Sequence, residues 1–373
     1  MKTVRTEYDR TVFILVFLLI GIGTVMLYSA SSTVAADEFG NSGYFLQRHL
    51  LRILLGAAIM IGFMRFNYRY LKKLSPLIYV VSILLLLATL GYYWSNNLAS
   101  PARWLPVGRF QLQTADVAKF AIVIYLAAYM SQRQESLRDF KHGLLPAVIM
   151  ISICVALIII QPDFSTAVSI GFIAFFLLYL GRAKIKHLIL LMVTFLTICG
   201  IVVYSSSYKL ERLTTFMNPT SDASDAGYQI QQSLISLGNG GLMGMGLGDS
   251  YEKNLFLPEP HTDFIYAIIG EELGFVGTAG ILTLFLLLYL QTLRIARKAP
   301  DLFGMYVTAG LGTAIFLYVV IHTGVVTGLV PTTGLPLPFI SYGGSHLVIT
   351  MASVGIILNV SSHQPAGKDQ GGW

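Results

Sequence analysis

Charged residues and cysteines are both scarce in this chain of 373 residues. Asp, Glu, Lys and Arg together make up 12% of it, about half of what a soluble domain carries, whereas hydrophobic residues make up 55%. The two cysteines, Cys154 and Cys199, fall inside apolar stretches and lack metal-ligand spacing. A disulfide framework, a cysteine-based metal site and a large soluble domain are therefore excluded.

Long apolar runs occupy nearly the whole sequence, with mostly short polar joints between them. A bilayer core of about 30 Å requires roughly 20 apolar residues per helix. The pattern predicts an all-α, polytopic integral membrane protein with ten transmembrane helices. The first run is longer than the apolar part of a signal peptide, so we expect it to be retained. The expected spans are 11–31, 47–64, 74–94, 114–131, 143–161, 164–181, 187–205, 263–290, 305–328 and 343–360.

Basic residues gather on one side of this predicted bundle. Most of the 25 Lys and Arg residues flank the span ends that share a side with the N-terminus. Because cytoplasmic loops are enriched in these residues, both termini are expected to be cytoplasmic. The net charge of +6 follows from this bias and does not indicate a nucleic-acid partner. Eight basic residues fall at or near the outer face, where each is either a stray surface charge or an anion-binding group: Arg48, Arg52, Arg103, Arg109, Lys119, Lys209, Arg212 and Lys253.

The longest connection runs from about 206 to 262, on the outer face. It contains an amphipathic stretch, YQIQQSLISL, and a glycine cluster, GNGGLMGMGLG, so we expect partial order packed on the membrane surface. The cluster lacks the register of a nucleotide-binding loop, and its glycines are expected to allow tight turns and close backbone approach. We interpret the chain, 1–373, as a single membrane domain with this long extracytoplasmic loop.

Acidic side chains crowd the stretch PEPHTDFIYAIIGEELG, which leads into the eighth span. If the helix begins near Asp263, then Glu271 and Glu272 lie about 12 to 13.5 Å deeper at ~1.5 Å per residue, inside the hydrocarbon. An ionisable group there costs on the order of 2.5–3.5 kcal/mol. The two glutamates are therefore either polar ties between helices or residues that face a cavity.

Asp263 stands at the water boundary of this span, beside His261 and Glu259. A carboxylate at a helix start can simply cap the helix. Because acids crowd here and outer basic residues are available to face them, Asp263 can also serve as a general base or as the ligand of a hard divalent cation, Mg²⁺ or Mn²⁺. These alternatives stay open, and no cofactor is certain.

Two further stretches combine turn residues with apolar ones. QPDFST contains Asp163 and is explained either by turn chemistry or by a polar cavity. GLVPTTGLPLPFISYGGS is a run of broken backbone between the last two spans. Such backbone is tolerated at membrane level only where it lines a cavity or is buried in protein. Ser341 and Tyr342 within it are candidate substrate-binding residues.

These motifs resemble the SEDS family of bacterial cell-shape and division proteins, RodA and FtsW. The resemblance covers nearly the entire chain and is carried by PEPHTDFIYAIIGEELG, GLVPTTGLPLPFISYGG, QPDFSTA, the early SAS, and RW…G…FQ…K before the fourth span. HTDFIYAIIGEELG and GLPLPFISYGG look more like FtsW, the septal member, than RodA. The resemblance implies the SEDS fold, with ten spans and cytoplasmic ends.

The resemblance also implies an inverting peptidoglycan glycosyltransferase of the bacterial cytoplasmic (inner) membrane, at the division septum. It would polymerise lipid II, an undecaprenyl-pyrophosphate disaccharide peptide, beside a class B penicillin-binding protein transpeptidase (FtsI-like) and other divisome membrane proteins. The aspartate regarded as essential in the family falls on Asp263. Two alternatives stay open, which are a lipid II flippase and a non-catalytic divisome scaffold that activates a partner synthase.

A lipid-linked diphosphate needs cations, and Arg103, Arg109 and Lys119 are candidates to hold it. His261 and Glu259 are further candidates for substrate contact. One departure from the family pattern affects this set, because the chain reads Gln-Thr-Ala-Asp116 where the family usually reads QPSE. The role of Asp116 as a polar cavity residue is therefore in doubt, and Lys119 is either a pyrophosphate ligand or the counter-ion of Asp116.

Overall fold

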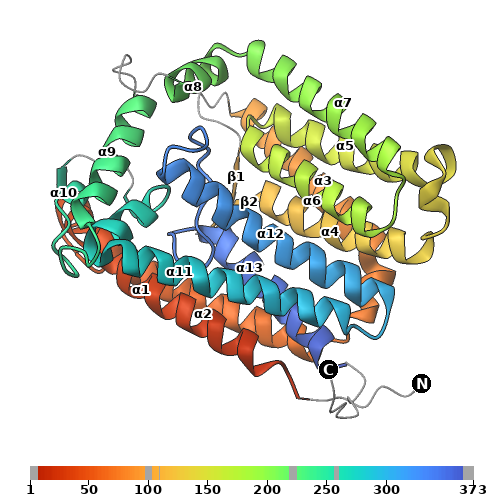
Figure 1. Cartoon of the computed structure of the whole chain (residues 1–373), viewed down its shortest axis with the longest axis horizontal. Helices are drawn as coiled ribbons and strands as arrows, with labels where there is room; N and C mark the ends of the chain where they lie inside the picture. Colours follow the sequence, from red (N-terminus) through yellow and green to blue (C-terminus); the bar gives the residue numbers. More distant parts are fainter. Residues whose placement is uncertain (1–6, 97–102, 109, 218–224, 256–259, 364–373) are drawn as a thin grey trace.

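The structure is a computed structural model that describes residues 7–96, 103–108, 110–217, 225–255 and 260–363. Helices dominate it, and most of them run side by side in one bundle (Figure 1). The long helices are α1 (Arg10–Phe39), α2 (Tyr44–Arg65), α3 (Arg69–Ser95), α4 (Thr114–Gln132), α5 (Leu145–Ile160), α6 (Phe164–Leu180), α7 (Ile185–Tyr204), α11 (Ile265–Arg297), α12 (Leu302–Val326) and α13 (Gly344–Ser361). The outer connection contains α8 (Ser207–Met217), α9 (Asp225–Gly240) and α10 (Glu252–Leu255).

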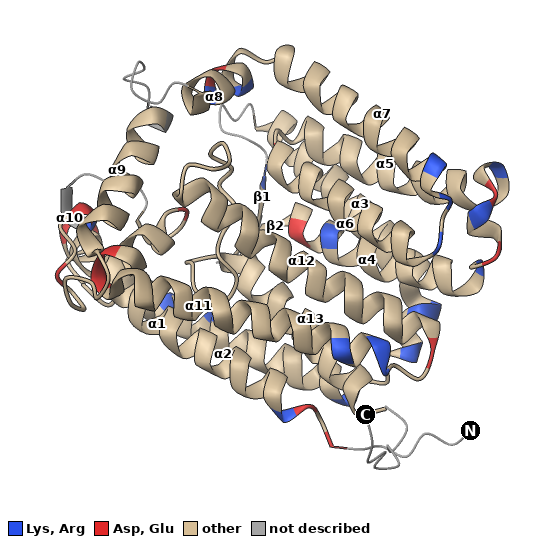
Figure 2. Ribbon diagram, viewed as in Figure 1, with Lys and Arg blue, Asp and Glu red and all other residues tan. Residues whose placement is uncertain are grey.

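Each of the ten predicted spans coincides with one of the long helices. Nine of the helices that the structure describes are long and apolar enough to cross a membrane, and α6, with 17 residues, is a shorter apolar helix. The backbone N–H of Asp9 donates to Ser361 Oγ at 3.0 Å, so the start of α1 and the end of α13 lie at the same end of the bundle. Figure 2 shows Lys and Arg gathered near this end. Ten crossings and the cytoplasmic side of the termini stay predictions.

The helices differ widely in how far they are covered by their neighbours. In α4, α12 and α13 most residues are buried, and these three helices form the centre of the bundle. In α7 only Leu188 is buried, because this helix packs against α6 on one side and leaves the rest of its apolar surface open. The open surface matches an apolar solvent such as a bilayer, in which leucine side chains need no burial.

A small β-hairpin departs from the otherwise all-α architecture. Strands β1 (Trp104–Val107) and β2 (Phe110–Gln113) are antiparallel, with Trp104 opposite Gln113. The backbone N–H of Gln113 donates to Ser345 Oγ at 2.9 Å, so the hairpin is attached to the first turn of α13. Two short strands therefore lie in the outer connection that precedes α4.

Helix α11 is broken at Gly274, where φ is 67° and ψ is −167°. A break frees carbonyl groups before it and N–H groups after it, and each must find another partner. The glycine cluster supplies these partners. Its glycines allow the close backbone approach expected from the sequence, since a Cβ on Gly244 would lie only 2.2 Å from the carbonyl oxygen of Glu272. The four bonds are Met245 N to Glu271 O, Gly246 N to Glu272 O, Phe275 N to Gly241 O, and Val276 N to Leu242 O, all between 2.9 and 3.1 Å.

Glu271 and Glu272 lie in the first part of α11, before the break at Gly274. At the other end of α11, Gln291 Nε2 donates to Asp9 Oδ2 at 2.6 Å, at the end of the bundle that carries both termini. Glu272 lies nineteen residues earlier, about 28 Å away at ~1.5 Å per residue. That distance nearly spans a hydrocarbon core of about 30 Å. The helix begins close to Asp263 as expected but is interrupted at Gly274, and the depth of the two glutamates in a bilayer stays a prediction.

Replacing Gly274 by alanine should destabilise the protein by at least 1–3 kcal/mol, because only glycine adopts this backbone conformation without strain. The new Cβ would also lie 2.3 Å from Gly244 N and 2.6 Å from Leu242 O. Gly280→Ala is the matched control, since nothing lies within 4 Å of a Cβ there. Thermal unfolding in detergent should show a lower Tm for Gly274→Ala only, and equal Tm values would contradict the break.

Candidate active site

Asp263 lies in the turn just before α11, and its side chain is partly buried. Phe264, and not Asp263, occupies the N-cap position of this helix. Gly334 has a left-handed φ of 70°, and a Cβ built on it would lie 3.4 Å from Asp263 Oδ2. The backbone N–H of Tyr342 donates to the carbonyl of His261 at 2.9 Å. The segment 331–343 is therefore folded against the Asp263 turn at two points.

The segment 331–343 keeps its irregular shape through internal contacts. Leu337 and Ile340 are fully buried. Ser341 Oγ accepts a hydrogen bond from Leu337 N at 2.8 Å, and His322 Nδ1 lies 2.9 Å from the carbonyl oxygen of Leu335. Broken backbone is thus buried in protein here, as the sequence predicts. The hydroxyl of Ser341, a candidate for substrate contact, therefore stabilises the backbone of the segment 331–343.

An aromatic cluster stands beside Asp263 and includes the two other candidates from this region. The ring of His261 lies 4.4 Å from the ring of Phe45 in α2 and 5.7 Å from that of Tyr342. Phe45 and Tyr342 meet edge to face at 5.1 Å. His261 is buried, so it forms part of a wall beside Asp263.

Five cations of the outer face have no carboxylate partner among the ion pairs of the described residues: Arg48, Arg52, Arg103, Lys209 and Arg212. Arg212 Nη1 donates to the carbonyl oxygen of Thr332 at 3.0 Å, two residues before Gly334. Arg103 Nη2 donates to the carbonyl oxygen of Pro162 at 2.7 Å. Burial lowers the pKa of the Lys209 ammonium. Cations that lack acidic neighbours favour an anionic ligand at this face.

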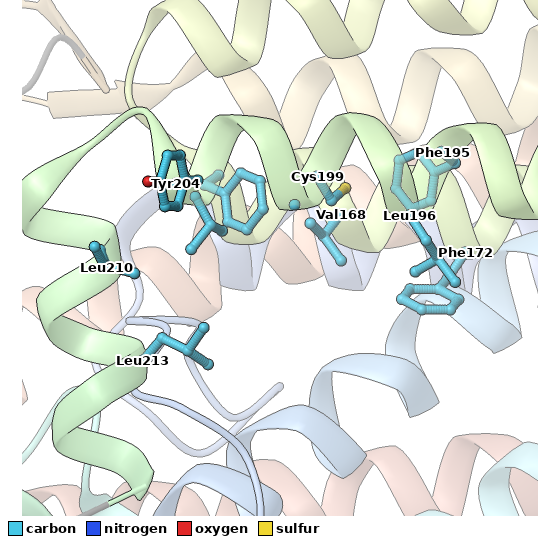
Figure 3. Close-up of a pocket in the computed structure, with 11 residues that line it drawn as sticks. Val168, Phe172, Phe195, Leu196, Cys199, Tyr204, Leu210 and Leu213 are labelled. Atoms are coloured by element: carbon cyan, nitrogen blue, oxygen red, sulfur yellow. The ribbon is translucent and has the colours of Figure 1, made fainter.

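An apolar groove of about 380 Å³ lies between α6, α7 and α8, beside Lys209 (Figure 3). The Nζ of Lys209 lies 5.2 Å from the ring of Phe164, which lines the groove. The lining is entirely apolar apart from the Tyr204 hydroxyl and the Cys199 thiol. Its other members are Val168, Phe172, Phe195, Leu196, Gly200, Val203, Leu210 and Leu213.

Asp163 and Asp116 occupy separate places on the inner side of the hairpin. Asp163 Oδ1 accepts the backbone N–H of Thr166 and thereby caps α6, and its Oδ2 accepts from Gln113 Nε2 at 3.0 Å. Asp116 pairs with Lys119 at 2.8 Å, within α4. Turn chemistry therefore accounts for Asp163.

Lys119 is buried within the bundle with its counter-ion. Its Nζ lies 3.5 Å above the ring of Tyr318, and His346 Nδ1 lies 3.3 Å from Asp116 Oδ1. The side chains of Lys119 and Asp116 are 8% and 1% exposed. Of the two interpretations of Lys119, this geometry favours the counter-ion, and pyrophosphate would have to displace a buried pair to reach it.

Glu271 ties the outer segment to the break in α11. Its carboxylate accepts hydrogen bonds from Ser236 in α9 at 3.0 Å, from Ser250, and from the backbone of Tyr251 at 3.2 Å. The carboxyl of Glu252 is also buried, and burial together with the nearby Glu271 raises its pKa. Of the two interpretations of Glu271, the polar tie matches these contacts.

Glu272 forms a second tie, to α1. Its carboxylate accepts from Ser29 Oγ at 2.6 Å and pairs with Lys253 Nζ at 2.8 Å. The Lys253 ammonium also donates to the carbonyl oxygen of Gly248 at 2.7 Å. Lys253 is one of the eight outer basic residues, but nothing in the sequence pairs it with Glu272. The pairing arises because the break at Gly274 brings the glycine cluster against α11.

Two sequence candidates, Arg109 and Glu259, lie outside the described residues. Within the described residues, no group of three or more His, Cys, Asp or Glu side chains is arranged to hold a metal ion. The structure adds Arg52 and Arg212, which contact the segment 331–343, and Lys209, which lies beside the apolar groove, to the candidate site residues. Their signal in the sequence was a basic residue on the outer side, which did not distinguish them from the other five.

Comparisons with known proteins place this arrangement in context. A model of the FtsW/RodA/SpoVE family, described as cell cycle proteins, matches residues 9–366. The chain is 39% identical over 365 residues to stage V sporulation protein E of Bacillus subtilis, covering 97% of this chain and 99% of the relative. It is 37% identical over 356 residues, 95% of each chain, to a Geobacter metallireducens protein named "Probable peptidoglycan glycosyltransferase FtsW".

Solved structures share the fold. One chain, from the work described as "Structural coordination of polymerization and crosslinking by a peptidoglycan synthase complex", has a TM-score of 0.78 and 26% identity, covering 95% of this chain and 97% of that one. The rod shape determining protein RodA of Thermus thermophilus has a TM-score of 0.70 and 25% identity, covering 95% and 96%. The family resemblance expected from the motifs is thus confirmed. The chain belongs to the FtsW/RodA/SpoVE family of cell cycle proteins.

Proposed function

We propose that this chain is a peptidoglycan glycosyltransferase that polymerises lipid II during septal cell-wall synthesis, with Asp263 as its general base. The observation that carries the proposal is the position of Asp263 against the segment 331–343, whose two ends contact Arg52 and Arg212, two cations with no ion pair among the described residues. The FtsW relatives carry the name of this activity.

Lipid II combines an isoprenoid tail, a diphosphate and a sugar, and the outer half of the molecule offers a match for each. The apolar groove between α6, α7 and α8 suits a hydrocarbon chain and opens beside Lys209. Arg212 presents a planar guanidinium that can hold a phosphate with two hydrogen bonds. Its hydrogen bond to Thr332 places it two residues from Gly334, which lies against Asp263.

The chemistry assigned to Asp263 is the transfer of one proton. Its carboxylate accepts the proton of the acceptor sugar's 4-hydroxyl, and that oxygen forms a bond to C1 of the donor sugar. The bond between C1 and the diphosphate oxygen breaks, and the diphosphate leaves with the electron pair. Attack from the side opposite the leaving group inverts C1. The proton transfer requires a carboxylate oxygen at ~2.6–3.2 Å from the hydroxyl.

A divalent cation offers a second role for Asp263, in which Mg²⁺ or Mn²⁺ would join its carboxylate to the diphosphate oxygens. The described residues bring no further pair of metal ligands to it, which favours the base. Polymerisation measured with EDTA and then with added Mg²⁺ or Mn²⁺ separates the two roles. Activity that persists in EDTA supports the base, whereas loss and recovery with the cation support the ligand.

We further propose that the chain works at the septum of the bacterial inner membrane with a class B penicillin-binding protein transpeptidase. Support comes from the structural neighbour, which belongs to a complex described as coupling polymerization to crosslinking. Other divisome membrane proteins are expected nearby. Nothing in the fold or the charge distribution indicates a nucleic-acid partner.

The test of the proposed activity uses the purified chain with labelled lipid II, alone and with its transpeptidase partner. A glycosyltransferase forms glycan ladders that resist penicillin, which blocks only the partner. Movement of lipid II between liposome leaflets without polymer would instead identify a flippase. Ladders that form only after a separate peptidoglycan polymerase is added, and persist in Asp263→Ala, would identify a scaffold.

A further inference from the structure

Arg52 lies in the first half of α2 and forms no ion pair with a carboxylate among the described residues. Its guanidinium carbon lies 4.3 Å from the centre of the Tyr342 ring, and its Nη1 is buried with no hydrogen-bond partner in the described chain. His49, one turn earlier on the same helix face, is fully buried, and both of its ring nitrogens also lack a described partner. Buried donors without acceptors are costly, so this cluster suits an anionic ligand.

The start of α13 adds backbone donors to this cluster. Arg52 Nη2 and Cζ lie 3.8 Å from the position that a Cβ on Gly344 would take. Gly343 occupies the N-cap position and has no side chain to accept the first N–H groups of this helix of 18 residues. The N-terminus of a long helix attracts phosphate through these groups and its dipole. Arg52 and the helix start thus face the same space.

Arg52 and Arg212 contact opposite ends of the segment 331–343. Arg52 packs on Tyr342, whereas Arg212 binds the carbonyl oxygen of Thr332. Their helices, α2 and α8, lie on opposite sides of α12 and α13 (Figure 1). Asp263 sits between the two contacts, because it touches Gly334 and follows His261, which is bonded to Tyr342. On each side of the candidate base there is therefore one arginine that forms no ion pair with a described carboxylate.

We propose that Arg52, with the start of α13, binds the diphosphate of a second lipid-linked substrate, separate from the one at Lys209 and Arg212. The inference rests on the proposed function and deepens it. Joining two lipid-linked sugars brings two diphosphates to one base, and their negative charges repel unless each has its own cations. Two separate cation sites flanking Asp263 meet that requirement.

Binding without turnover tests the second site. Calorimetric titration of inorganic pyrophosphate into the purified chain should show two classes of site. Arg52→Gln should weaken one class about tenfold to a hundredfold, as expected for a lost charge-assisted pair, and Arg212→Gln should weaken the other. The matched control is Arg48→Gln, because Arg48 is exposed on the same helix and packs only on Tyr44 at 4.2 Å. Arg52→Lys should restore part of the affinity if the lost charge is the cause.

Kinetics give a second readout that a purely structural role would not move. In the lipid II assay, Arg52→Gln should raise KM about tenfold while kcat changes little, at an unchanged Tm. If the wild type shows two classes of pyrophosphate-binding site and Arg52→Gln lacks one of them, the second site is supported. This holds even if the wild type forms no glycan, a result that would contradict only the proposed function. A single class in the wild type, or wild-type binding and KM in Arg52→Gln, overturns the inference.

Discussion

Replacing Lys253 by methionine should lower the free energy of unfolding by about 3–5 kcal/mol, the usual result of removing one partner of a buried ion pair. The side chains of Lys253 and Glu272 are 5% and 0% exposed. Without the ammonium, the Glu272 carboxylate keeps only the hydrogen bonds from Ser29. The outer segment would also lose one of its attachments, the ion pair and hydrogen bond that join Lys253 to Glu272 in α11 and Ser29 in α1. Chemical or thermal unfolding in detergent measures the effect.

Two controls separate the buried charge from the loss of a long side chain. Lys253→Met combined with Glu272→Gln should recover much of the stability, because no uncompensated charge remains. Arg10→Met removes an exposed pair with Glu7, in which both side chains are 79% exposed, and should change stability by less than about 1 kcal/mol. Equal stability of Lys253→Met and the wild type would show that the pair does not hold the segment in place.

The predictable part of the fold is the set of helices, because apolar runs of bilayer length leave few alternatives. The break at Gly274 was not predictable, since LGFVG reads as a continuous helix and the break depends on hydrogen bonds from residues 241–246. Helix α1 also continues to Phe39, through the polar residues expected to form an outer loop. The break at Gly274 arises from contacts with a segment about thirty residues away in the sequence, whereas Phe39 at the end of α1 stacks on Tyr44, five residues later.

In the candidate site, too, contacts between residues close in the sequence could be predicted, whereas contacts between distant residues could not. Asp116 and Lys119 are three residues apart, so their pairing along α4 could be anticipated, and it was kept as one of two interpretations. Arg52 and Arg212 could be recognised only as outer basic residues. What distinguishes them is contact with the segment 331–343, which lies more than a hundred residues away along the chain. Such a contact cannot be predicted from the residues that surround Arg52 or Arg212 in the sequence.

Asp263→Asn should lower the rate of lipid II polymerisation by about 10²–10⁴-fold, the usual contribution of a positioned general base. Asparagine has nearly the same size and keeps polar contacts, but its amide does not accept the proton of a sugar hydroxyl. Because Asp263 lies in a turn and is only partly buried, the folded state should tolerate the change. Asp263→Glu keeps the carboxylate at a shifted position and should retain more activity than Asp263→Asn.

The most direct measurement of the central claim is the initial rate of glycan formation from labelled lipid II by wild type and Asp263→Asn, at equal amounts of folded protein and with the transpeptidase partner inhibited. The account predicts that pyrophosphate binding and Tm stay at wild-type values while the rate falls at least a hundredfold. A rate for Asp263→Asn within a few fold of the wild type, with binding and folding intact, would contradict the assignment of Asp263 as the base.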